Sequence, residues 1–172
     1  MSELLKPVEG NRFILAHAPI PNEMLLIDKK YCIVVMSDHE KEKILNAKIV
    51  EIAHGDVLVI GFGLGMILIP MMENPKINSI TVIEKEQEVL DLVASQLPFN
   101  DKVNIVLFDA LQWRTNKKFD IIWDDANYLP SEDKDIQYKI EIAKKRMISW
   151  LKPNGVFMKF DEVLKEEKWL VG

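Results

Sequence analysis

The sequence contains one cysteine, Cys32, and three histidines that lie far apart along the chain. A single thiol cannot form an internal disulfide, and no group of Cys and His residues offers the four ligands of a structural zinc site. We expect each histidine at the surface or in a loop rather than as a ligand or a catalytic base. The 172 residues must therefore fold on a hydrophobic core alone, and one domain of this size buries roughly two thirds of the surface of its unfolded chain.

A secretory signal and a membrane-spanning stretch are also missing from the sequence. The first ten residues carry Glu3 and Pro7, where a signal peptide has a basic patch followed by an apolar run. The most apolar stretch, residues 57–72, contains three glycines and is shorter than the roughly 20 residues of a spanning helix. We therefore expect a cytoplasmic protein without a membrane partner.

Positive charge is scarce as well. The 22 Lys and Arg residues face 27 Asp and Glu residues, which gives a formal net charge of −5. Proteins that wrap nucleic acid need the opposite balance, because basic residues displace counterions from the phosphate backbone. The composition therefore predicts no nucleic acid partner.

From residue 55 onward, short apolar runs alternate with longer amphipathic stretches. The first two runs are almost continuously apolar, which is typical of strands covered on both faces of a parallel sheet. Strands that alternate with helices through right-handed crossovers predict a doubly wound, Rossmann-like α/β sheet. The expected strands are residues 57–60, 80–83, 103–108, 119–123 and 156–160, and the expected helices are about 64–72, 86–96 and 133–151.

The first 54 residues follow a different pattern. They predict a small β-rich flap, followed by a helix that packs on the main sheet, with Ser37 or Asp38 as the N-cap. We therefore divide the chain into residues 1–54, the flap and helix, and residues 55–172, the sheet domain. The extended runs of the flap are residues 13–15 and 32–36, and its helix covers about residues 40–53.

The clearest local signal is the glycine turn GFGLG at residues 61–65, which directly follows the first apolar run. Glycines at a strand-to-helix turn permit positive φ and let a ligand approach the backbone, and the N–H groups of the new helix attract negative charge. A dinucleotide fingerprint needs a third glycine where Met66 stands, so the spacing does not favour pyrophosphate. Pro70 lacks an N–H donor and is expected to shorten or kink the helix.

An acidic residue, Glu84, ends the second run, 23 residues after the first glycine of the turn. A carboxylate at this place can accept hydrogen bonds from both hydroxyls of a ribose bound at the turn. As a residue at a strand end, Glu84 is expected to be exposed and to add little to packing. Glu86 and Glu88 continue the same charged run and are expected to be surface glutamates.

Further carboxylates end the third and fourth runs, where open α/β sheets bind their ligands. Asp109 can accept the exocyclic amine of an adenine, and Ala110 leaves room for the ring. Asp124 and Asp125 end the fourth run. Successive side chains of a strand point in opposite directions, so only one of these two aspartates can face the pocket.

Taken as a set, the stretches DVLVIGFGLG, TVIE, LFDA, FDIIWDD and WLKPNGV resemble the class I S-adenosylmethionine-dependent methyltransferase superfamily, including its spermidine synthase-like relatives. The resemblance covers about residues 55–160. It implies S-adenosylmethionine as the cofactor, methyl transfer to a small or unknown acceptor, and a catalytic role for Asp125 beside the donor sulfonium. The cofactor-binding residues that it implies are Gly61, Phe62, Gly63, Leu64, Gly65, Glu84, Lys85, Asp109 and Ala110.

Three alternatives stay open. Metal-dependent O-methyltransferases also resemble the fourth run, and there Asp125 and Asp161 would hold Mg²⁺. Aminopropyl transfer, the spermidine synthase reaction, would use Asp38 and Asp125 as amine contacts. The third alternative is a truncated protein that only binds or degrades S-adenosylmethionine. Nucleic acid amino-methyltransferases are disfavoured, because DANY at residues 125–128 lacks both prolines of their motif.

The end of the sequence suggests a shortened sheet. Members of the superfamily usually continue through two more strands, whereas residues 161–172 suffice for one short helix. We therefore expect the sheet to be truncated after its fifth strand. An exposed sheet edge needs cover, which the N-terminal flap or a second copy in a homo-oligomer could supply.

Overall fold

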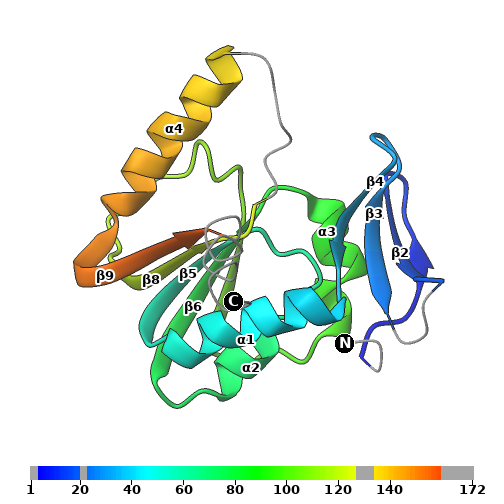
Figure 1. Cartoon of the computed structure of the whole chain (residues 1–172), viewed down its shortest axis with the longest axis horizontal. Coiled ribbons are helices and arrows are strands. Elements are labelled where there is room, and N and C mark those ends of the chain that lie inside the picture. Colours follow the sequence, from blue (N-terminus) through cyan, green and yellow to red (C-terminus); the bar gives the residue numbers. More distant parts are fainter. Residues whose placement is uncertain (1–3, 20–22, 127–133, 160–172) are drawn as a thin grey trace, which may run out of the picture.

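The computed structural model describes residues 4–19, 23–126 and 134–159, and these form two sheets (Figure 1). The antiparallel sheet has the order β1-β2-β3-β4, and the five-stranded sheet has the order β7-β6-β5-β8-β9. The predicted α/β class, the five parallel strands and the β-rich N-terminal extension are thus confirmed. The strands are β1 Val8–Glu9, β2 Phe13–His17, β3 Met24–Asp28, β4 Ile33–Ser37, β5 Gly55–Ile60, β6 Ile77–Glu84, β7 Val103–Leu107, β8 Phe119–Asp124 and β9 Leu151–Lys159. The helices are α1 Glu40–Ile52, α2 Leu68–Glu73, α3 Gln87–Leu92, the 3-10 turn Ala94–Gln96 and α4 Lys134–Ile148.

Strand β5 shows why the apolar runs form a sheet that is covered on both faces. Val57 and Val59 pack in one buried cluster with α1, α2 and α3, whereas Leu58 and Ile60 pack in another with α4. Successive side chains of a strand point to opposite faces, so a continuously apolar strand requires helices on both sides. None of the helices in the described ranges is long and apolar enough to cross a membrane.

The order of the parallel strands determines where a ligand can bind. The chain winds outward from β5 through β6 to β7 and then returns to place β8 on the other side of β5. The winding therefore reverses between β5 and β8, and doubly wound sheets bind ligands at the carboxyl ends of the strands at such a reversal. Gly61 follows β5 at this place, and Asp125 follows β8.

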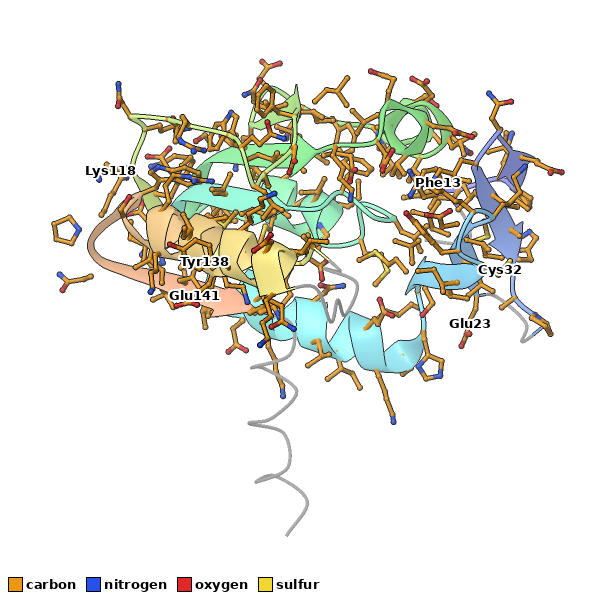
Figure 2. All side chains as sticks on the ribbon, turned by 90° about the horizontal axis from the view of Figure 1, so that it is seen from above. Phe13, Glu23, Cys32, Lys118, Tyr138 and Glu141 are labelled. Carbon is orange, nitrogen blue, oxygen red and sulfur yellow. The ribbon has the colours of Figure 1, made fainter. Side chains whose placement is uncertain are left out.

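The N-terminal sheet docks against α3 (Figure 1). The carboxylate of Glu88 on α3 accepts the backbone N–H of Arg12 at 2.9 Å and that of Phe13 at 3.2 Å. Figure 2 shows Phe13 at this junction, where it is 3% exposed and belongs to the same buried cluster as Val57. Residues before and after residue 54 thus share one hydrophobic core. The division of the chain at residue 54 stays a prediction.

The N-terminal sheet has four strands, whereas the sequence predicts two extended runs. The two missed strands are β1, which has only two residues, and β3. β3 contains one β-branched residue, Ile27, so its propensity for strand is weak, and its pairing along the full length of β2 stabilises it instead.

The N-cap of α1 is His39, so the predictions of Ser37 and Asp38 are wrong. His39 Nδ1 accepts a backbone N–H of the first turn at 3.3 Å. The carboxylate of Asp38 instead accepts the N–H of Met24 at 2.5 Å, and the hydroxyl of Ser37 donates to Glu42 at 3.0 Å. Tertiary contacts with β3 and α1 thus occupy the two better capping side chains.

Helix α2 is shorter than predicted and begins at Leu68. The chain between the glycine turn and α2 is held by single turns: Gly65 N–H donates to Phe62 O at 2.9 Å, and Leu68 N–H donates to Gly65 O at 3.1 Å. Pro70 stands in the first turn of α2, where backbone N–H groups have no intrahelical acceptor. Its missing donor therefore leaves no bond of the helix unmade.

An ion-paired lysine, Lys152, holds together the amino-terminal ends of the parallel strands, at the end of the sheet away from the glycine turn. Lys152 Nζ lies 2.8 Å from Asp56 and 2.7 Å from Asp120, and Asp120 also accepts the N–H of Asp56 at 2.7 Å. These bonds join the starts of β5, β8 and β9. They support the end of the sheet that lies away from the ligand-binding edge.

We expect Asp120→Asn to lower the melting temperature by roughly 2–4 °C at pH 7, because weakening a hydrogen bond to a charged group costs about 1 kcal/mol. Burial raises the pKa of Asp120, but the bonds from Lys152 and from the backbone of Asp56 outweigh it, and the pKa falls below its ordinary value of 3.8. The bond from Lys152 likewise lowers the pKa of Asp56. A carboxylate with a lowered folded pKa stabilises the fold above its unfolded pKa, and this stability is lost as the pH falls.

The difference in melting temperature between wild type and Asp120→Asn should therefore be complete at pH 7 and shrink below about pH 4. Circular dichroism melts at pH 7 and pH 3 measure it. Glu141→Gln is the control, because it breaks only the exposed pair with Lys145 on α4 and should leave the melting temperature unchanged. An equal difference at both pH values would contradict the electrostatic explanation.

Strand β9 forms one edge of the parallel sheet in the described part of the chain. Val156 on this strand is 41% exposed. On the neighbouring helix α4, Ala143 and Met147 are buried against the sheet, while Tyr138 is 63% exposed. The homo-oligomeric contact predicted for this edge stays a prediction.

Candidate functional site

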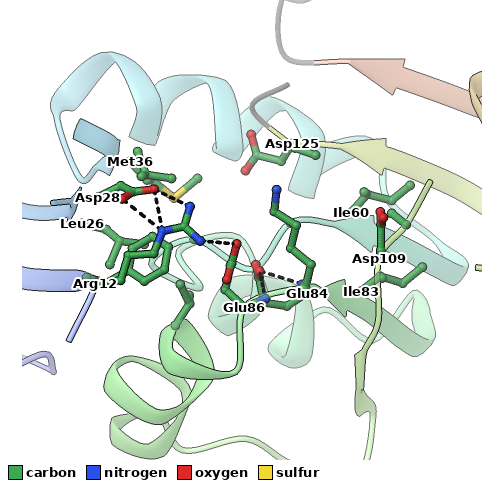
Figure 3. A pocket seen from close by; sticks show the side chains of 18 of the residues that line it. Arg12, Leu26, Asp28, Met36, Ile60, Ile83, Glu84, Glu86, Asp109 and Asp125 are labelled. Atoms are coloured by element: carbon green, nitrogen blue, oxygen red, sulfur yellow. Dashed lines mark hydrogen bonds and ion pairs between the residues drawn. The ribbon is translucent and has the colours of Figure 1, made fainter. Parts of the chain in front are cut away.

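A cavity of about 360 Å³ lies at the carboxyl ends of β5, β6 and β8, and the N-terminal sheet forms one of its walls (Figure 3). Its volume falls within the range of roughly 300–1,000 Å³ that is typical of small-molecule sites. The cavity brings together residues that follow four different strands. The predicted site residues that line it are Gly61, Gly63, Glu84, Lys85, Asp109, Ala110 and Asp125.

The other three predicted residues, Phe62, Leu64 and Gly65, do not line the cavity. Phe62 is 3% exposed and its ring meets that of Phe99 edge to face, with centroids 5.9 Å apart; Leu64 is fully buried. Side chains alternate along the turn, so those of Phe62 and Leu64 point into the core below while Gly61 and Gly63 face the cavity. The motif alone does not indicate this alternation.

The glycines allow the turn to pass between two other segments. Gly61 has a φ of +91°, and a Cβ there would lie 3.2 Å from the backbone oxygen of Asp125. Gly63 has a φ of +53°, and a Cβ there would collide with the sulfur of Met36 from the N-terminal sheet. A non-glycine residue would be strained at both positions, and at Gly63 it would also require Met36 to move. Met36 Sδ also accepts the N–H of Leu64 at 3.1 Å, which fixes the turn against β4.

Glu84 is buried, contrary to the expectation of an exposed carboxylate. It is 8% exposed, and its two oxygens accept three backbone N–H groups, from Phe62 at 2.9 Å, Lys85 at 2.7 Å and Glu86 at 2.8 Å. A carboxylate offers about four acceptor positions, so one remains for a ligand hydroxyl. Glu84 therefore joins the glycine turn to the end of β6 and still presents an acceptor to the cavity.

Asp109 and Ala110 lie in the short turn after β7. Asp109 Oδ1 accepts the N–H of Leu111 at 2.9 Å, and Oδ2 accepts the amide of Gln112 at 3.0 Å. Ala110 is 9% exposed and adds little bulk to the cavity wall. In Figure 3, Asp109 lies beside Ile60 and Ile83, which form an apolar floor next to its carboxylate.

Asp125 faces the cavity and Asp124 is fully buried, which confirms that only one of the two aspartates points into the site. The pKa of Asp125 is raised to about 8, first by burial and then by the charges of Glu42 and Asp124, while a hydrogen bond from Trp123 lowers it. Burial also raises the pKa of Glu42, which stands in the first turn of α1. The site therefore contains a carboxyl group that exchanges its proton near neutral pH.

Arg12 is a residue of the cavity wall that the sequence does not reveal. Its guanidinium lies 2.6 Å from Asp28 on β3 and 2.8 Å from Glu86 after β6, so it joins the two sheets (Figure 3). The expectation of surface positions for Glu86 and Glu88 is wrong, because Glu86 lines the cavity and Glu88 binds the backbone of β2. A lone arginine before a short apolar run carries no local signal for this contact.

Neither Asp38, proposed for aminopropyl transfer, nor Asp161, proposed for Mg²⁺ binding, is among the described residues that line the cavity. Asp38 is fully buried, bonds to the backbone of β3 and is absent from the cavity lining, so its predicted role as an amine contact is wrong. Asp161, the predicted second Mg²⁺ ligand, lies outside the described residues. Within residues 4–19, 23–126 and 134–159, no group of three or more His, Cys, Asp or Glu side chains could hold a metal ion.

Comparisons with known proteins agree with this architecture. No protein-family model matches the chain. A tRNA1(Val) (adenine(37)-N6)-methyltransferase from Glaesserella parasuis serovar 5 (strain SH0165) is 25% identical over 112 residues, which cover 58% of this chain. The match spans 48% of that enzyme, so the chain corresponds to about half the length of this curated relative.

Solved structures share the fold at lower sequence identity. The N-methyltransferase NodS from Bradyrhizobium japonicum WM9, in complex with S-adenosyl-L-homocysteine, aligns with a TM-score of 0.57 and 19% identity over 71% of this chain and 62% of NodS. CalS10 from Micromonospora echinaspora, an amino pentose methyltransferase with bound S-adenosylmethionine, aligns with a TM-score of 0.53 and 19% identity over 70% of this chain and 49% of CalS10. The chain therefore has the fold of class I S-adenosylmethionine-dependent methyltransferases.

Proposed function

We propose that this chain is an S-adenosylmethionine-dependent methyltransferase that acts on a small molecule. The observation that carries the proposal is that Gly61, Glu84, Asp109 and Asp125, from four strand ends, line one cavity. When bound, S-adenosylmethionine supplies a methyl group on a positively charged sulfur. The chain's own residues then have to bind the cofactor, orient the acceptor and accept a proton where the acceptor carries one.

The donor set of the cavity fits this cofactor. The remaining acceptor position of Glu84 suits a ribose hydroxyl, and the carboxylate of Asp109 suits the amine of an adenine whose ring lies beside Ala110. Gly61 and Gly63 leave the backbone accessible from the cavity. Asp125 lines the cavity near the turn, and its ionised form would face the sulfonium. We assign the exposed Lys85 to the rim of the cofactor site.

We assign the acceptor to small molecules rather than to nucleic acid. The relative from Glaesserella parasuis methylates a tRNA adenine, but this chain carries a net charge of −5. The N-terminal sheet forms one wall of the cavity, and the volume of about 360 Å³ favours a compact acceptor. CalS10, which shares the fold, acts on an amino pentose.

Aminopropyl transfer is the second candidate function, and the sheet that precedes the Rossmann-like core is the observation that favours it. The position of Asp38 away from the cavity weakens this candidate, because only Asp125 of the two predicted amine contacts remains. Binding or degradation of S-adenosylmethionine without an acceptor would use the same cofactor contacts. Analysis of the reaction products distinguishes binding or degradation of S-adenosylmethionine from methyl or aminopropyl transfer.

Thermal shift measurements test the proposal. S-adenosylmethionine and S-adenosylhomocysteine should each stabilise the protein by about 2.7 kcal/mol at one hundred times Kd, because a ligand of the folded state stabilises by mass action. NAD should produce no shift. Methylthioadenosine that stabilises best in the presence of putrescine would favour aminopropyl transfer, and stabilisation by NAD alone would contradict both proposals.

A further inference from the structure

The N-terminal sheet adds an apolar wall to the cavity that the cofactor contacts leave unused. The wall consists of Phe13 on β2, Leu26 on β3 and three residues of β4, Ile33, Val35 and Met36, and we call it the acceptor wall. In Figure 3, Leu26 and Met36 lie on the side of the cavity that is opposite to Asp109, with Glu84 between them. The acceptor wall thus faces the end of the cavity away from the proposed adenine position.

A β-bulge in β4 shapes the part of this wall that Val35 and Met36 form. Leu26 pairs with Met36 and Ile27 pairs with Val34, so Val35 is an extra residue in β4 that has no partner on β3. A bulge of this kind re-aims side chains and often occurs next to binding sites. Val35 and Met36 are consecutive residues, yet both line the cavity, whereas Val34 is 50% exposed and lies outside it.

The charged residues beside the acceptor wall are already paired. Arg12 bonds to Asp28 through two nitrogens and to Glu86 through a third. The guanidinium neutralises one of the two carboxylate charges and uses its donors on both, so the group keeps a net charge of −1 and an anionic ligand gains nothing from it. What remains for contact is the apolar surface, with Tyr31 beside it.

The acceptor wall also touches the glycine turn directly. Met36 Sδ accepts the N–H of Leu64, and Asp125 and Gly63 line the same cavity as Met36. A molecule that packs on Val35 and Met36 would therefore lie close to the turn and to the one cavity carboxyl with a strongly raised pKa. Positioning an acceptor and a base in this manner is what methyl transfer requires of a protein.

We infer that the acceptor wall is the acceptor subsite, and that the methyl acceptor has an apolar, aryl-sized body with one nucleophilic nitrogen or oxygen directed at Asp125. This inference rests on the proposed function, because it assigns the second substrate of the same cavity. It adds a specificity determinant, the bulged segment of β4, to the cofactor contacts. Val35 and Met36 then select the acceptor body, and Asp125 contacts its nucleophile.

Binding to the 172-residue chain saturated with S-adenosylhomocysteine tests the inference. Isothermal titration calorimetry with 2-phenylethylamine and 4-ethylphenol should show binding of at least one probe, and both putrescine and adenosine should bind more weakly than that probe. Val35→Thr keeps the shape of the side chain but adds a hydroxyl to the apolar wall, and should weaken binding of the probe about tenfold. The Kd of S-adenosylhomocysteine should change less than twofold.

Val34→Thr is the matched control, because the same substitution falls on the exposed face of β4 and should leave both affinities unchanged. Val35→Ala provides a second variant with less contact area if Val35→Thr folds poorly. Tighter binding of putrescine or adenosine, the absence of binding by both apolar probes, or an equal loss of S-adenosylhomocysteine affinity in Val35→Thr would overturn the inference while leaving the proposed function intact. If S-adenosylhomocysteine itself does not bind the wild type, the proposed function fails, and this inference with it.

Discussion

Replacing Glu84 by Ala is expected to remove cofactor affinity and to lower the free energy of unfolding by about 2–5 kcal/mol. The carboxylate accepts three backbone N–H groups, and a buried donor left without an acceptor costs about 1–3 kcal/mol, less where water can enter the vacated space. Since folded domains are stable by about 5–15 kcal/mol, this loss is a large part of the total. Urea unfolding measures the change in stability, and calorimetry with S-adenosylhomocysteine measures the change in affinity.

Two variants separate the structural role of Glu84 from its role in binding. Glu84→Gln retains one acceptor oxygen, so it should recover part of the stability but little of the affinity for the ribose hydroxyl. Glu73→Ala at the exposed end of α2 is the control and should change stability by less than about 0.5 kcal/mol. Unchanged affinity in Glu84→Ala would show that the ribose assignment is wrong, and unchanged stability would show that the three bonds do not support the fold.

The glutamates around Glu84 show where local sequence stops being informative. Glu84, Glu86 and Glu88 alternate with Lys85 and Gln87 in one charged run, yet each has a different role. Glu84 fixes the glycine turn, Glu86 pairs with Arg12 at the cavity, and Glu88 binds the backbone of β2. The roles of Glu86 and Glu88 depend on which segment docks against them, and that segment lies more than 70 residues earlier in the chain.

The parallel sheet, in contrast, could be predicted from local patterns. Residues 57–60 of β5 and 80–83 of β6 are nearly continuously apolar, because both faces of these strands are buried there. The carboxyl ends of parallel strands lie together at one end of the sheet. The positions of Gly61, Asp109 and Asp125 at the cavity follow from that rule. The N-terminal wall does not follow from it, because a short antiparallel sheet and a bulge at Val35 depend on pairing register rather than on composition.

The second large effect is expected at Asp125, where replacement by Asn should lower kcat by about 10²–10⁴-fold with a smaller change in cofactor affinity. The pKa of this carboxyl is raised to about 8, first by burial, so the ionised form that accepts a proton increases as the pH rises toward 8 and above. The wild-type kcat/KM should therefore rise with pH through about 8 and then level off. Asp125→Asn should show no such rise, which steady-state measurements of S-adenosylhomocysteine formation between pH 6 and 9.5 can establish.

The raised pKa of Asp125 also makes the free energy of unfolding depend on pH, so stability measurements test the pKa independently of activity. The folded pKa of this carboxyl is raised above the ordinary value of 3.8, so its stabilising contribution is complete below that value and is lost as the pH rises through about 8. Asn at this position takes up no proton on folding, so the wild type should lose stability relative to Asp125→Asn as the pH rises from about 4 to about 8.

A substitution at a neighbouring carboxylate provides the control for the pH dependence. Glu42 on α1 and Asp124 on β8 both raise its pKa, so Glu42→Gln should move the pH profile to lower values while turnover persists. A profile that does not move in Glu42→Gln would contradict the electrostatic coupling. An equal loss of kcat and of cofactor affinity in Asp125→Asn would make this residue a binding contact instead of a base. A carboxylate can act both as a base and as a contact for a cation. Measuring the loss of kcat separately from the loss of cofactor affinity shows which of these roles Asp125 has.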